Sequence, residues 1–173
     1  MEIFWQILLA LGPAVVVYFT VTQFLQKQGE KEIKHLQIEL RKERQSFFLP
    51  NRLEAYQRVI LYLERIHPNA LIMRVHNPVL SAKVFQSELI KTIREEFDHN
   101  VAQQLFISPS TWKLISNAKE ETTKIINVSA ANLKEDAGAT DLAEKVLELV
   151  SEVGEVPSDI AVNVLKGEFQ ELL

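Results

Sequence analysis

Two Glu-x-x-His spacings are the residues of this sequence whose types and positions could do chemistry. They run from Glu64 to His67 and from Glu96 to His99. On a helix, residues three apart project from one face, so each pair could present a carboxylate beside an imidazole. Di-iron carboxylate bundles use two such pairs, together with one Glu from each of two further helices. A metal-binding helical bundle is therefore one function that the sequence allows.

The surroundings of the two pairs argue against a metal site. His67 directly precedes Pro68, where a helix is expected to end. Glu96 adjoins Phe97, which is expected to face the core, so Glu96 is predicted to face solvent. We therefore predict no metal and no cofactor, and four residues remain as metal-ligand candidates: Glu64, His67, Glu96 and His99.

No other catalytic arrangement emerges from the sequence. The chain has no cysteine, which excludes thiolate metal sites and Cys nucleophiles. Its five glycines are spread too widely to form a phosphate-binding loop. Ser108 and Ser110 flank Pro109 and are typical of a helix start. Because no catalytic motif is found, we expect a non-enzymatic protein. The net charge of −4 argues separately against a dedicated nucleic-acid binder.

Four arginines in one region could pair with acids or bind an anion. They are Arg52, Arg58, Arg65 and Arg74. Glu54 and Glu64 lie nearby in the sequence, so surface ion pairing is the favoured interpretation and an anion-binding patch is the alternative.

The segment 3–21 carries no charged side chain. Nineteen helical residues span about 28 Å, close to the hydrocarbon thickness of a bilayer. The alternatives to a membrane span are a cleaved signal peptide and a buried core helix. A signal peptide would have a basic start and a shorter apolar run, so we predict a retained transmembrane anchor over residues 1–25. Its marker residues include aromatic rings near both ends and a helix-kinking proline: Ile3, Trp5, Leu8, Pro13, Val16, Tyr18 and Val21.

The residues that flank the apolar run predict its orientation. No Lys or Arg precedes the run, whereas several come after it, beginning with Lys27, Lys31 and Lys34. Because basic residues favour the cytoplasmic side, we expect a single-pass protein of the bacterial inner membrane, with its N-terminus outside and its C-terminal domain in the cytoplasm.

Residues 26–49 are polar and predict a helical stalk with a thin apolar stripe. The stripe, which could pair two copies, consists of Ile33, Leu36, Leu40 and Phe47. These are heptad a and d positions, although Glu43 occupies the intervening d position. Pro50 is expected to end the stalk, with Asn51 capping the next helix.

The remaining residues, 50–173, predict a small all-α bundle of about five helices. Apolar residues recur at helical spacing over 51–66, 82–104, 109–132, 140–153 and 158–172, and the segment 69–76 is typical of a short helix or turn. Ser81, Ser108 and Ser158 are the expected N-caps, and Gly154 the expected helix end. Such amphipathic helices joined by short loops form a bundle.

Three stretches carry a resemblance to a known family. They are Leu49–Arg58, Leu63–Arg65 and Ile93–Ser108, and the similarity continues through the segment SPSTWKLISNAKEE. The chain resembles an uncharacterised family of small bacterial proteins, of the Bacteroidetes group, with one N-terminal membrane helix. The resemblance implies membrane anchoring and a helical domain, and it implies no activity, ligand or site.

Charge is polarised along the chain, which bears on partners. Residues 135–173 hold two basic and ten acidic groups, a net charge of −8. This end is either a solvated face or a docking surface for a basic partner or a second copy. We therefore expect an adaptor, assembly factor or accessory subunit that contacts membrane lipid and other proteins of an inner-membrane complex. The alternatives are the metal-binding bundle and a homo-oligomeric structural membrane protein.

Overall fold

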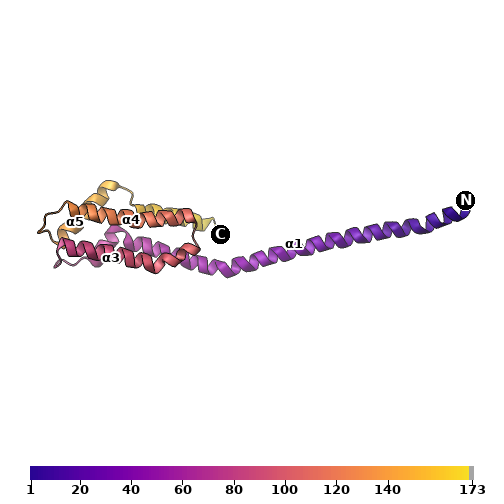
Figure 1. The fold of residues 1–173 in the computed structure, drawn as a ribbon, viewed down its shortest axis with the longest axis horizontal. Helices are drawn as coiled ribbons and strands as arrows, with labels where there is room; N and C mark the ends of the chain where they lie inside the picture. The colour runs from indigo at the N-terminus through magenta and orange to yellow at the C-terminus, as the bar shows by residue number, and fades with distance from the viewer. Residues whose placement is uncertain (172–173) are drawn as a thin grey trace. The chain divides into compact units, whose positions relative to one another are not determined.

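The computed structural model describes the backbone of residues 1–171 and the side chains of residues 1, 17–44 and 46–171. Over this range the chain is all-helical, as predicted, with six α-helices and one 3-10 helix (Figure 1). They are α1 (Glu2–Ile66), α2 (Pro68–Val75), α3 (Ala82–Asn100), η1 (Val101–Leu105), α4 (Pro109–Ala131), α5 (Ala139–Val153) and α6 (Pro157–Gln170).

The chain divides into two units, Met1–Leu49 and Pro50–Leu173. The first unit is a single stretch of α1. The second is the helical bundle, which holds the last turns of α1 and all the other helices.

The predicted helix break at Pro50 is wrong, because α1 continues through Pro50 and Asn51 to Ile66. A proline inside a helix removes one backbone hydrogen bond and costs about 3 kcal/mol. Long runs of good helix formers flank Pro50, and their summed preference outweighs that local cost.

Most helix starts of the bundle follow from local capping. The Oγ of Ser81 accepts the N–H of Val84 at the start of α3, and Ser108 accepts that of Thr111 at the start of α4, so both predicted caps are confirmed. The predicted Ser158 cap is wrong. Val156 is the N-cap of α6, and the following Pro157 fills the first helical position.

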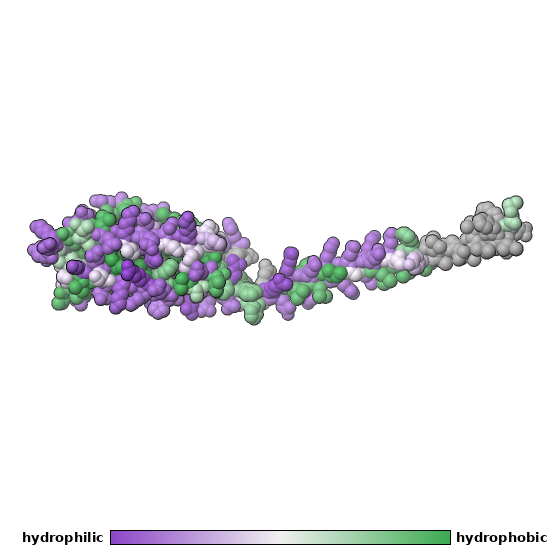
Figure 2. All heavy atoms as spheres, in the orientation of Figure 1, coloured by the Kyte–Doolittle hydropathy of each residue, from purple (hydrophilic) through white to green (hydrophobic). Residues whose placement is uncertain are grey.

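One apolar core joins the helices of the bundle. Helix α4 packs against α3, α5 and α6, and α3 also packs against α5. The last turns of α1 contribute Tyr56, Val59 and Leu63 to the same core. Other side chains with no exposed surface include Phe85, Leu89, Ile93, Ile115, Leu142, Val146 and Leu165. On the outer surface, hydrophilic residues dominate the face of the bundle seen in Figure 2.

In the first unit the residues described from position 17 onward are exposed, except Thr22 and Gly29, which are partly buried. Tyr18 and Val21, the two expected anchor residues in this range, are 70% and 48% exposed. Ile3, Trp5, Leu8, Pro13 and Val16 lie outside the described side chains. Among the residues described, no helix has both the length and the hydropathy that crossing a membrane requires.

Candidate functional site

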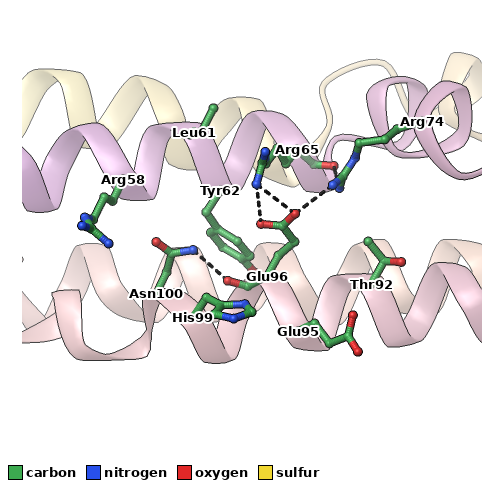
Figure 3. Close-up of a pocket in the computed structure, with 10 residues that line it drawn as sticks. All are labelled: Arg58, Leu61, Tyr62, Arg65, Arg74, Thr92, Glu95, Glu96, His99 and Asn100. Carbon is green, nitrogen blue, oxygen red and sulfur yellow. Dashed lines mark hydrogen bonds and ion pairs between the residues drawn. The ribbon is translucent and has the colours of Figure 1, made fainter.

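An open groove of about 630 Å³ lies in the bundle where α1, α2 and α3 meet (Figure 3). Its lining is rich in arginine and also contains two glutamates and a histidine. We call it the arginine groove, and its residues are Arg58, Leu61, Tyr62, Arg65, Arg74, Thr92, Glu95, Glu96, His99 and Asn100.

Glu96 is the centre of this groove. Both its carboxylate oxygens accept hydrogen bonds from Nη1 of Arg65, each at 3.2 Å. Nη1 of Arg74 donates to Oε1 at 2.8 Å. Figure 3 shows the two guanidinium groups converging on Glu96 from α1 and α2. The Glu96 side chain is 14% exposed, so the prediction that it faces solvent is wrong. Ile93 and Phe97 on the same helix belong to or pack against the core, and two cations compensate for the partial burial of Glu96.

The surroundings of Glu96 fix its protonation state. Burial alone would raise the pKa of this carboxyl, but the hydrogen bonds and positive charges of Arg74 and Arg65 together lower it below its usual value. Glu96 is therefore ionised at neutral pH, and both its oxygens accept hydrogen bonds from guanidinium groups. Such a carboxylate joins three helices and is poorly suited to act as a general acid or to bind a metal.

The arginines pair only partly as predicted. Nη2 of Arg58 lies 2.7 Å from Oε1 of Glu54, which confirms a surface pair. Arg65 and Arg74 instead pair with Glu96 on another helix. Sequence proximity could not reveal this arrangement, because Glu96 lies 31 residues beyond Arg65 in the chain.

The structure separates the two Glu-x-x-His pairs. Glu96 and His99 both line the arginine groove, whereas Glu64 is exposed on α1. Nδ1 of His67 accepts the N–H of Asn69 at the start of α2, and its Nε2 lies 3.6 Å from Oδ2 of Asp159. Within the described part of the chain, no three His, Asp or Glu side chains are placed to hold a metal ion.

Sequence reasoning missed a second partly buried carboxylate, that of Glu168 on α6. The N–H of Ser108 donates to Oε1 at 2.9 Å, and its Oγ donates to Oε2 at 2.7 Å. The hydroxyl of Tyr56 donates to Oε1 at 2.5 Å. Glu168 therefore lies at the N-terminus of α4, where the helix dipole favours an anion, and it links α4 to α6 and α1.

These contacts shift two pKa values. Burial would raise the pKa of Glu168, but hydrogen bonds from Thr111, Tyr56 and Ser108 bring it down to about 2. Burial and the adjacent Glu168 raise the pKa of Tyr56 to about 12. The Ser108-Pro109 signal marked this helix start, but nothing local identifies the carboxylate 60 residues away that binds there.

The expected stalk residues are all solvent-exposed. Ile33, Leu36, Leu40 and Phe47 are exposed by 62%, 60%, 46% and 72%. The four apolar side chains are therefore solvent-exposed, and no described residue of this chain covers them.

Comparison with known proteins places the chain in a family. No curated protein and no solved structure matches it significantly. A family of unknown function, DUF7935, matches residues 2–172. Because the match covers nearly the whole sequence, the chain belongs to this family of unknown function.

Proposed function

We propose that this chain is a non-enzymatic, membrane-anchored adaptor. Residues 1–25 would anchor it in a bacterial inner membrane, and the bundle from Pro50 onward would bind other proteins of a membrane complex at the cytoplasmic face. Three features support the proposal: the apolar run, the pairing of Glu96 and Glu168 with donors from neighbouring helices, and a charged helix face.

The continuity of α1 carries the proposal. One helix contains the uncharged run 3–21 and also the core residues Val59 and Leu63. A run of that length matches the hydrocarbon thickness, and the basic residues from Lys27 onward favour a cytoplasmic location for the rest of the chain. An anchor of this kind would tether the bundle to the membrane.

The chemistry of the bundle supports binding rather than catalysis. Glu96 and Glu168 are the carboxylates with lowered pKa values, and both are ionised and occupied by donors from neighbouring helices. Carboxylates with these surroundings stabilise a fold, whereas an acid–base catalyst needs a pKa near the working pH.

An acidic helix face offers a surface for a basic partner. Asp141, Glu144, Glu148 and Glu152 follow one another at three- or four-residue steps on α5, and all are exposed. The only Lys or Arg on α5 is Lys145, whose Nζ lies 2.6 Å from Oε2 of Glu148. A predominantly acidic surface of this kind steers a positively charged partner and contributes to specificity.

Anchoring is tested by washing membranes with alkaline carbonate. We expect the full chain to stay in the membrane pellet. Leu11→Arg combined with Val15→Arg should release it, because each charge at the centre of a span costs about 2.5–3.5 kcal/mol. Ile38→Arg, outside the run, is the matched control and should stay in the pellet. Release of the unmodified chain would contradict the anchor.

The adaptor role is tested by purification from gently solubilised membranes. We expect one or more stoichiometric partners that are lost from Glu144→Lys/Glu148→Lys. The variant Glu88→Lys/Glu121→Lys makes the same charge change on α3 and α4 and should retain them. Purification of the chain alone, or equal loss from both variants, would count against this role.

A further inference from the structure

The apolar stripe on the first unit is the surface that most needs a partner. Ile33, Leu36 and Leu40 follow one another at steps of three and four, and Phe47 comes seven residues later. Each side chain is 46% or more exposed. Hydrophobic residues lie among hydrophilic ones along this helix in Figure 2. Spacing of this kind forms the seam of a two-helix coiled coil.

We propose that residues 33–47 of α1 pair with the same residues of a second copy as a parallel, in-register coiled coil. Ile33, Leu40 and Phe47 take the a positions, and Leu36 and Glu43 the d positions. β-branched Ile at a with Leu at d is the combination that favours two parallel strands.

The charges beside the seam support a second copy in parallel orientation. In this register Glu32 and Glu39 occupy g positions, and Gln37 and Arg44 occupy the next e positions along the chain. In a parallel dimer, each g residue faces the next e residue of the partner. Glu39 then meets Arg44 of the other copy, an attractive pair, and Glu32 meets an uncharged Gln37. An antiparallel dimer would bring g residues together, so that glutamates face glutamates.

The orientation also rests on the proposed anchor. Two copies inserted in one membrane with the same topology have parallel helices at the same depth, which sets the register. Confinement to a membrane also raises the effective concentration of the two segments. That contribution matters because Glu43 at a d position weakens the seam, so a short coiled coil of this composition depends on the shared membrane.

Disulfide crosslinking tests the contact directly, because the chain has no native cysteine. In membranes containing the full chain, oxidation should convert most of Leu36→Cys to a covalent dimer. Ile38→Cys is the matched control, since Ile38 is 56% exposed but lies at an f position, on the far side of the helix. It should give little dimer. Equal crosslinking at both positions, or none at Leu36→Cys, would overturn the proposal.

Charge exchange tests the orientation. Added to the Leu36→Cys chain, Glu39→Arg or Arg44→Glu should each reduce crosslinking several-fold, because each places like charges opposite one another. Co-expression of the two variants should restore crosslinking, since every g–e pair across the mixed dimer is then attractive. Unchanged crosslinking in the single variants, or no recovery on mixing, would contradict the parallel register. If crosslinking fails while the chain resists carbonate, the dimer is wrong and the anchor stands.

Discussion

Glu96 and Glu168 show how the bundle uses partly buried carboxylates. Each is ionised, and each accepts hydrogen bonds from two other helical segments. The donors differ: Glu96 is held by two guanidinium groups, whereas Glu168 is held by hydroxyls and a backbone N–H at a helix start. Both hold helices in register, and this is the role that the structure supports for them.

Removing the charge of Glu96 should destabilise the bundle. Glu96→Gln leaves Arg65 and Arg74 facing each other without a counter-charge, at an expected cost of about 1–3 kcal/mol in the free energy of unfolding. Glu95→Gln is the matched control on the same helix. Its carboxylate is 58% exposed and 3.9 Å from Lys91, so the change should stay within about 0.5 kcal/mol. Thermal unfolding of the full chain in detergent measures both, and equal shifts would contradict the assignment.

Glu168 should make the stability of the bundle depend on pH in the acidic range. Its pKa in the folded chain, about 2, lies below the usual value of 4.5, so ionised Glu168 favours the folded state. This contribution is complete above about pH 4.5 and is lost as the pH falls from there towards 2. In Glu168→Gln the midpoint of unfolding should be lower at neutral pH and should fall less steeply over that window. Glu171→Gln, at the exposed end of α6, should retain the steep fall, and a Glu168→Gln profile parallel to that of the unmodified chain would refute this role.

At the scale of elements, two glycines should respond in opposite ways to the same substitution. Gly154 ends α5 with φ +81°, a conformation that other L-residues rarely adopt, so Gly154→Ala should destabilise the bundle by about 1–2 kcal/mol. Gly167 lies within α6 and has open space around an added Cβ. Gly167→Ala should therefore stabilise by about 0.5–1 kcal/mol. Unfolding midpoints measure both changes, and two shifts of the same sign would disprove this interpretation of the backbone.

The sequence predicts a structural feature well when the residues that cause it lie close together in the chain. Ser81, Ser108 and Gly154 mark helix ends correctly, because a cap involves residues only a few positions apart. Pro50 misleads, because helix preference on both sides outweighs one proline. The Glu96 and Glu168 sites could not be predicted, since each joins residues brought together only by packing. Helical spacing alone also fails to tell Val84 from Phe85, of which the first is 46% exposed and the second fully buried.

At the scale of the whole molecule, we propose different roles for the two units, Met1–Leu49 and Pro50–Leu173. The bundle contains the buried apolar core, and its two carboxylates with lowered pKa values, Glu96 and Glu168, are both bound by groups of the bundle itself. The partners proposed for the apolar run 3–21 and for the stripe over 33–47 are lipid and a second copy, respectively.

Labelling of single cysteines tests most directly the proposal that α1 anchors a cytoplasmic bundle. The chain has no native cysteine, so Glu2→Cys and Glu135→Cys each report one side of the anchor. A membrane-impermeant maleimide is added to spheroplasts before and after permeabilisation. We predict that Glu2→Cys is labelled in intact spheroplasts and that Glu135→Cys is labelled only after permeabilisation. Labelling of Glu135→Cys in intact spheroplasts would contradict a cytoplasmic bundle.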